Sequence, residues 1–220
     1  GQYFSLDYMN NQGKFINNFA DNGMSPSQIQ STKFYVGPAI NLLLDNRNNK
    51  VLPERGTRIS ATARHMWGLN DKSQNLTSID FDLSLFVSIV ENSRSILATR
   101  FGYGRNFGDY EFFQAQYLGG KENLRGYHNN RFAGRTKMFN NTEIRFRIAN
   151  FNTYLFPGSI GLVAFNDVGR VWVDDENSSD WHVGNGIGLW VSPLHRFVIT
   201  GYFTRSKEGN LPLVTFGFQF

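Results

Sequence analysis

The sequence contains no cysteine and no long hydrophobic run among its 220 residues. Without cysteine, the chain has no disulfide bond, no thiol nucleophile and no metal site with a cysteine ligand. No stretch approaches the roughly 18 consecutive apolar residues of a membrane-spanning helix, so the pattern excludes a helical membrane protein. The net charge of +4 is too small to indicate a nucleic-acid partner, and we expect none.

The common catalytic motifs are missing as well. The sequence has no Gly-x-Ser-x-Gly, no His-Glu-x-x-His and no phosphate-binding loop, so we expect no enzyme activity, no catalytic residue and no cofactor. One acidic segment carries oxygen ligands of the kind that calcium uses: Asp174, Asp175, Glu176 and Asp180. A solvated acidic loop explains this segment better, and we predict no metal site.

Alternation of apolar and polar residues with a period of two is the clearest pattern that the sequence does have. It is most regular from Ile79 to Ile89, and it recurs near residues 144–148, 183–191 and 214–220. Three glycines within residues 184–188 continue such a strand, which indicates close packing rather than a nucleotide-binding loop. We expect ten strands, at about residues 2–9, 32–44, 57–68, 77–90, 95–104, 142–151, 160–172, 182–192, 196–205 and 211–220.

Alternation alone does not separate a soluble β-sandwich from a transmembrane β-barrel. Aromatic residues near the expected strand ends resemble the interfacial girdle of an outer-membrane barrel; they are Tyr8, Trp67, Tyr103, Trp172 and Trp181. The last strand is also an alternating aromatic one. These features favour an all-β, antiparallel transmembrane β-barrel of about ten strands, with a long loop folded into the lumen. The absence of linkers and repeats indicates one domain over residues 1–220.

The segment from about Arg105 to Asn140 has no convincing strand pattern, and loops of this length are usually functional or disordered. Within it lies the run Tyr117-Leu118-Gly119-Gly120-Lys121-Glu122-Asn123-Leu124-Arg125-Gly126-Tyr127. Two further motifs are Phe165-x-Asp167-x-Gly169, and Asp45-x-Arg47 followed by Pro53 and Gly56. Together they resemble the sixth extracellular loop, the Phe-x-Asp-x-Gly strand and the Asp-x-Arg turn of the Omp85 superfamily. The resemblance covers about residues 31–220 and concerns the C-terminal portion of its BamA- and TamA-like bacterial surface antigen barrels.

This resemblance implies a contact between the long segment and the barrel interior. In the family, the loop arginine binds the acidic residue of the Phe-x-Asp-x-Gly strand, which implies that Arg125 binds Asp167, with Gly126 and Tyr127 at the loop tip. Glu143, expected on the polar face of its strand, is a second candidate partner. Neighbouring glycines permit the tight turns that such a loop needs, and a guanidinium binds carboxylates through paired hydrogen bonds. The alternative is that Arg125 is a solvated loop charge.

The resemblance also implies a function and a location. The family's insertion and translocation members act in the bacterial outer membrane and carry periplasmic domains before a sixteen-strand barrel. This sequence shows neither those domains nor the first six strands, so it is a C-terminal piece or a small member. We expect protein insertion or translocation, with membrane lipid and outer-membrane client proteins as partners. A barrel that anchors or exports an N-terminal passenger enzyme, and a passive pore, are the alternatives. A short first strand leaves a poorly paired seam, through which two copies could also pair.

The C-terminal residues carry a second expectation. Phe216, Phe218 and Phe220 resemble the signal by which the assembly machinery recognises outer-membrane strands. The alternative is that these residues, with Val214, simply face lipid, as the alternation already requires. The two readings differ in what the loss of Phe220 does to assembly in cells and to refolding in detergent.

Overall fold

The computed structural model describes residues 2–4, 32–89, 94–154, 156–174 and 179–220. The described chain consists mainly of β-strands, with one 3-10 segment, η3 (Phe112–Gln114). The strands are β1 (Gln2–Phe4), β2 (Lys33–Val36), β3 (Ala39–Asp45), β4 (Gly56–Gly68), β5 (Leu76–Ser88), β6 (Ser95–Gly108), β7 (Gln116–Leu118), β8 (Phe132–Gly134), β9 (Thr136–Asn152), β10 (Pro157–Trp172), β11 (His182–Pro193), β12 (Ile199–Ser206) and β13 (Gly209–Phe216). Most of the strand expected at 2–9 lies outside the described residues, as do Tyr8, Asp175 and Glu176.

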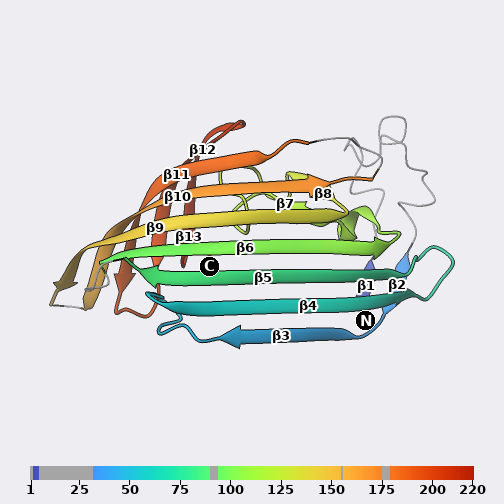
Figure 1. Ribbon diagram of the computed structural model, residues 1–220, viewed down its shortest axis with the longest axis horizontal. Helices are drawn as coiled ribbons and strands as arrows, with labels where there is room; N and C mark the ends of the chain where they lie inside the picture. Colours follow the sequence, from blue (N-terminus) through green and yellow to red (C-terminus); the bar gives the residue numbers. More distant parts are fainter. Residues whose placement is uncertain (1, 5–31, 90–93, 155, 175–178) are drawn as a thin grey trace.

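The long strands form one antiparallel sheet in the order β1-β2-β4-β5-β6-β9-β10-β11-β12-β13, with β3 also beside β4 (Figure 1). The strand expected at 32–44 is therefore two strands, both paired with β4. Val36 lies opposite Trp67, and pairing resumes with Ala39 opposite Arg64. Pro38 lies between them, and because proline has no backbone N–H it interrupts the ladder.

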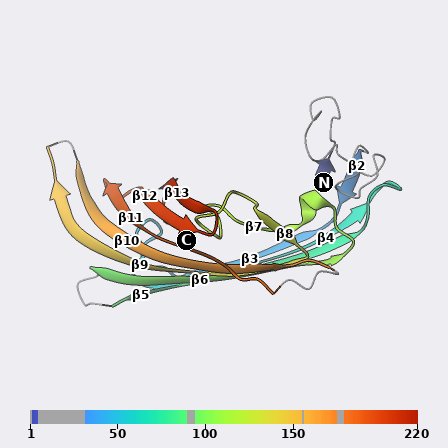
Figure 2. The same ribbon diagram turned by 90° about the horizontal axis from the view of Figure 1, so that it is seen from above.

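The sheet is strongly curved, and the long loop and the end of the chain lie on its concave side (Figure 2). We call this concave side the inner face and the opposite side the outer face. In the part of the chain that the structure describes, β3 pairs only with β4 and β13 only with β12, so the two edges do not close the sheet on itself. The predicted all-β antiparallel class is confirmed, and the curvature is that of a barrel wall.

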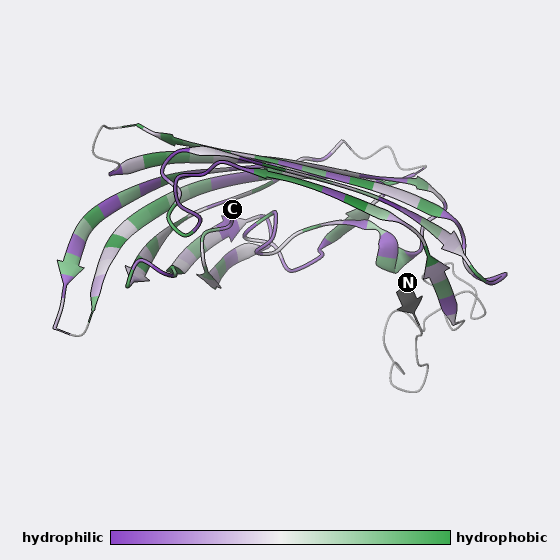
Figure 3. Ribbon diagram, turned by 90° about the horizontal axis from the view of Figure 1, so that it is seen from below, coloured by the Kyte–Doolittle hydropathy of each residue, from purple (hydrophilic) through white to green (hydrophobic). Residues whose placement is uncertain are grey.

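The two faces of the sheet differ in polarity, because successive side chains of each strand point to opposite sides. In β9, Ile144, Phe146 and Ile148 are 45 to 52% exposed on the outer face, whereas Glu143 and Arg145 are buried on the inner face. The resulting bands of hydrophobic and hydrophilic residues are visible along the strands (Figure 3). No helix in the described part of the chain is long and apolar enough to cross a membrane.

The long loop is shorter and more ordered than the sequence indicated. The expected segment ran from about Arg105 to Asn140, but β6 continues to Gly108 and β9 begins at Thr136. The long loop is therefore residues 109–135, and it contains η3 and the small β7–β8 hairpin. Its strand content escaped the sequence pattern because three-residue strands are too short to display a period of two.

The end of the chain departs from the expected alternation. The sequence predicted one strand over 211–220 with its aromatic residues facing lipid, but β13 ends at Phe216. Val214 and Phe216 are 68% and 84% exposed, whereas Phe220 is only 9% exposed. Gly217 has a φ of 96°, which an extended strand does not accommodate, and beyond it the chain turns onto the inner face.

Candidate functional site

Arg125 in the long loop lies on the inner face of the sheet, against β10. Its Nε donates a hydrogen bond to Asp167 Oδ2 at 2.8 Å, and its Nη2 donates one to Asp167 Oδ1 at 2.8 Å. The backbone N–H of Arg125 also donates to Asp167 Oδ2, at 3.0 Å. One carboxylate thus binds both the guanidinium and the main chain of Arg125, which fixes the position and the orientation of the loop.

Two residues of β9 complete this buried charge network. Glu143 accepts a hydrogen bond from Arg125 Nη1 through one oxygen and from Arg145 Nε, at 2.8 Å, through the other. The exposed fractions are 1% for Arg125, 2% for Arg145 and 0% for Glu143 and Asp167. We call these four residues the lock. Their charges balance, so the removal of any one leaves one buried charge uncompensated, which costs about 3 to 5 kcal/mol.

Aromatic rings surround the guanidinium of Arg125. Its central carbon lies 3.7 Å from the ring centroid of Phe165 and 5.1 Å from that of Tyr202, both cation–π distances. Phe165 and Asp167 belong to one motif and share a face because they are two positions apart. Burial acts to lower the pKa of the Arg125 guanidinium, but the charge of Glu143 and the hydrogen bonds to Asp167 raise it overall. The arginine is therefore charged at every physiological pH.

The backbone beside Arg125 approaches the sheet closely. Gly126 has a φ of 91°, which suits glycine, and its carbonyl oxygen accepts a hydrogen bond from Ser206 Oγ at 2.5 Å. On β11, a Cβ atom at Gly184 would overlap the carbonyl oxygen of Arg125. The glycines at 184–188 therefore include one position that must lack a side chain for the loop to reach Asp167.

Apolar packing holds the loop on either side of the lock. Leu118, Leu124 and Tyr127 of the loop pack with Phe139 of β9 in a buried cluster. The Tyr127 hydroxyl donates a hydrogen bond to the carbonyl oxygen of Val183 at 3.3 Å. Tyr127, expected at the loop tip, is thus 4% exposed and anchors the loop to β11.

Several residues of the site were not singled out from the sequence. Asn141 Nδ2 donates to the carbonyl oxygen of Asn123 at 2.8 Å, and Arg100 Nη1 donates to that of Glu122 at 3.0 Å. The sequence could have indicated Asn141, because it is two residues before Glu143 and side chains two positions apart in a strand lie on the same face. For Arg100, no sequence pattern indicates which loop carbonyl it binds.

A second polar contact joins the long loop to the turn between β12 and β13. Glu208 accepts hydrogen bonds from the backbone N–H of His128 at 3.1 Å and from Arg131 Nε, and His128 Nδ1 lies 2.9 Å from it. Partial burial acts to raise the pKa of Glu208, but the hydrogen bonds from His128 and Arg131 lower it to about 2. Glu208 therefore stays ionised and holds the loop at His128 and Arg131.

The end of the chain reaches the lock through Arg145. Arg145 Nη2 donates to the carbonyl oxygen of Phe220 at 3.2 Å, and its guanidinium carbon lies 3.8 Å from the ring centroid of Phe218. The Phe220 ring packs against Phe86 of β5. Of the three phenylalanines of the expected assembly signal, only Phe216 remains on the outer face.

Asp175 and Glu176 of the acidic segment lie outside the described residues, so the structure does not test this segment as a metal site. Asp174 accepts hydrogen bonds from Arg135 Nε at 2.7 Å, which lower the pKa of its carboxyl group.

The Asp-x-Arg turn lies at the opposite end of the sheet. Arg47 Nε and Nη2 donate to Asp45 at 2.9 and 2.8 Å, so this turn is an ion pair within one loop.

The comparisons with known proteins identify the family of this chain. The family model of the Omp85 superfamily domain matches residues 4–220, so this chain belongs to the Omp85 superfamily. In the lock, Arg125 of the long loop meets Asp167 of the Phe-x-Asp-x-Gly strand. The resemblance in the sequence rested on these two motifs. No curated protein matches the chain.

Among solved structures, the chain is similar to the crystal structure of BamA from Haemophilus ducreyi lacking POTRA domains 1–3. The TM-score is 0.65 at 14% sequence identity, and the match covers 85% of this chain and 43% of that one. At this identity the likeness concerns the fold alone. This chain therefore spans less than half of the length of the BamA structure that it matches.

Proposed function

We propose that this protein acts in the bacterial outer membrane, in the insertion or translocation of outer-membrane proteins. Membership of the Omp85 superfamily supports this function at the level of the family. The observation that carries the proposal is the lock, because Arg125, Glu143 and Asp167 hold the long loop against the inner face by buried, paired charges. We propose no bond-making chemistry and no cofactor for this site.

The edges of the sheet suggest how a client protein would be engaged. β3 and β13 each have one partner strand among the described residues, so the outer edge of each presents backbone N–H and C=O groups. An extended client segment can add to such an edge by main-chain hydrogen bonds, with its apolar residues toward lipid. The docked loop would keep the curvature of the sheet constant while an edge pairs and releases its client.

The inner face also bears on the passive-pore alternative. The long loop covers β9 and β10, and Phe218 and Phe220 cover the inner face near Arg145. An inner face filled in this way favours a low conductance. Single-channel recordings in planar bilayers measure it directly: brief, small currents fit the proposal, and a large steady conductance identifies a pore.

Insertion itself is tested with the protein in liposomes. An unfolded outer-membrane protein is added, and its folded fraction is followed by the shift in gel mobility of unheated samples. Faster folding than in empty liposomes supports insertion. If the protein integrates into the liposomes and leaves the client's folding rate unchanged, insertion is contradicted, and the role of a membrane anchor for a passenger domain is favoured.

A further inference from the structure

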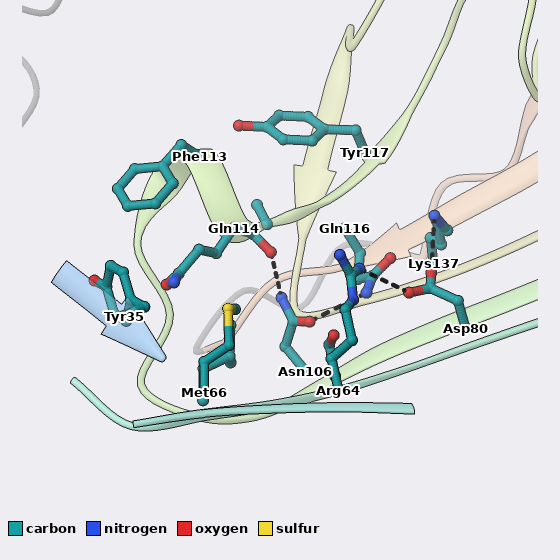
Figure 4. Close-up of a pocket in the computed structure, with 13 residues that line it drawn as sticks. Tyr35, Arg64, Met66, Asp80, Asn106, Phe113, Gln114, Gln116, Tyr117 and Lys137 are labelled. Carbon is teal, nitrogen blue, oxygen red and sulfur yellow. Dashed lines mark hydrogen bonds and ion pairs between the residues drawn. The ribbon is translucent and has the colours of Figure 1, made fainter. Parts of the chain in front are cut away.

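A cavity of about 490 Å³ lies on the inner face between β4, β5, β6 and β9 and the start of the long loop (Figure 4). Its volume is within the range of roughly 300 to 1,000 Å³ that small-molecule sites occupy. η3 and β7 form its roof: Asn106 Nδ2 donates to the carbonyl oxygen of Gln114 at 2.7 Å, and Gln116 Nε2 donates to Asn106 Oδ1 at 3.1 Å. The cavity therefore exists only while the loop is docked.

Two buried polar atoms around this cavity, Arg64 Nε and Ser78 Oγ, have no hydrogen-bond partner among the described residues. The Tyr35 hydroxyl, in contrast, interacts with the side chains of Ser73 and Gln114. Tyr35 and Ser78 are each only 2% exposed. Buried polar groups in proteins are nearly always hydrogen-bonded, so Arg64 Nε and Ser78 Oγ need a partner within the cavity.

The donor chemistry of these atoms restricts the partner. Arg64 Nε can only donate, so it needs an acceptor atom on the ligand. Tyr35 and Ser78 carry hydroxyl groups, which both donate and accept, as the hydroxyl groups of a sugar do. The ligand must therefore carry strong acceptors and also groups that exchange hydrogen bonds with hydroxyls.

The charges in the cavity are unequal. Asp80 lies 3.4 Å from Arg64 Nη2 and 3.3 Å from Lys137 Nζ, so two cations share one carboxylate at long distances. One positive charge is left over at this end of the cavity, whereas Tyr35 and Gln114 lie at the other end (Figure 4). A cationic pair with spare donors favours an oxyanion over a neutral group.

We propose that this cavity binds a small phosphorylated sugar, with its phosphate toward Arg64 and Lys137 and its hydroxyl groups toward Ser78 and Tyr35. The aromatic side chains of Tyr35, Phe113 and Tyr117 supply apolar walls for the body of the ligand. The site is on the inner face, away from the exposed apolar side chains that face lipid, so the ligand arrives from water and not from the bilayer. Because loop residues form the roof, the ligand would also stabilise the docked loop.

Calorimetric titration of the protein refolded in detergent tests the proposal, with glucose 6-phosphate, inorganic phosphate and glucose as probes. Glucose 6-phosphate should bind more tightly than either of the others. Arg64→Gln removes a charged donor and should weaken that binding about 10-fold or more. Lys72→Gln is the matched control, because it removes one exposed positive charge from the loop between β4 and β5, outside the cavity, and should leave the affinity unchanged.

A second variant and a second readout guard against misfolding. Ser78→Ala removes only a hydroxyl group and should weaken glucose 6-phosphate several-fold, while the heat-dependent gel shift reports that the sheet is folded. The ligand should also slow protease cleavage of the long loop in the wild type. The proposal is overturned if no probe binds, which would leave a water-filled cavity, if glucose or inorganic phosphate binds as tightly as glucose 6-phosphate, or if Arg64→Gln behaves like Lys72→Gln.

Discussion

Arg125 and Asp167 are 42 positions apart in the sequence, yet one carboxylate accepts hydrogen bonds from Nε, Nη2 and the backbone N–H of the same arginine. The contact joins a loop to the middle of a strand in a site that is almost fully buried. Its strength depends on the planar shape of the guanidinium, which a lysine ammonium does not reproduce.

Arg125→Lys should therefore open the long loop although it keeps the charge. Lysine offers no pair of parallel donors to Asp167, and the loss of a buried charged hydrogen bond costs about 1.5 to 3 kcal/mol. Limited proteolysis of the folded protein in detergent should show faster cleavage within residues 109–135. Cleavage at the wild-type rate would indicate that charge alone holds the loop.

Gly184→Ala, a substitution in β11, should push the long loop away from the sheet. Its Cβ would overlap the carbonyl oxygen of Arg125, whereas a Cβ at Gly201 has nothing within 4 Å. We expect Gly184→Ala to raise protease cleavage of the loop as much as Arg125→Lys does, and Gly201→Ala to leave it unchanged. Equal cleavage of both alanine variants would mean that strand flexibility, not close approach, determines access to the loop.

The contact of Glu208 with His128 and Arg131 should weaken in acid. The pKa of Glu208 is lowered from 4.5 to about 2, so its stabilising effect is fully present above pH 4.5 and is lost as the pH falls toward 2. Because His128 and Arg131 are exposed, the effect is about 1 kcal/mol or less. Hydrogen exchange of residues 126–131 should be faster at pH 3 than the intrinsic rate change predicts, and Glu208→Gln should abolish this extra pH dependence. An unchanged pH dependence in the variant would assign the effect to another group.

Variants of the last phenylalanines distinguish a role in packing from a role as an assembly signal. Phe220→Ala removes a buried ring and should destabilise the protein in detergent by about 3 to 5 kcal/mol. Phe216 is 84% exposed, so Phe216→Ala should change stability in detergent much less. If these residues are also an assembly signal, Phe216→Ala should reduce the folded protein in the outer membrane of cells while refolding in detergent is normal. Normal amounts in cells would leave only a lipid-facing role for Phe216.

The sequence was informative where a local pattern determines the structure. Alternation placed β5 and β10 within a few residues of their ends, because the side chains on one side of each strand are buried on the inner face and those on the other side are apolar and exposed. For β9 it found the C-terminal end but missed the first six residues, since the strand begins at Thr136 and was predicted from 142. The resemblance of the loop and strand motifs indicated which loop residue and which strand residue to compare, Arg125 and Asp167.

Other features depend on contacts that no single segment encodes. Phe218 and Phe220 leave the alternating pattern because Gly217 turns the chain and Arg145, far away in sequence, offers its guanidinium to the Phe218 ring. The contact of Glu208 with the loop depends on the relative position of two turns. The cavity roofed by η3 likewise follows from how the loop docks, so its lining residues carry no common sequence signal.

The central claim is that the lock keeps the loop in place for the insertion of client proteins. It is tested most directly by the initial rate of client folding in liposomes that contain equal amounts of folded wild-type protein, Arg125→Ala or Arg196→Ala. Arg196 is an exposed arginine outside the lock and serves as the control. We expect Arg125→Ala to reduce the rate about tenfold or more, toward that of empty liposomes, and Arg196→Ala to match the wild type. A wild-type rate for Arg125→Ala, with its loop shown by proteolysis to be open, would contradict the claim.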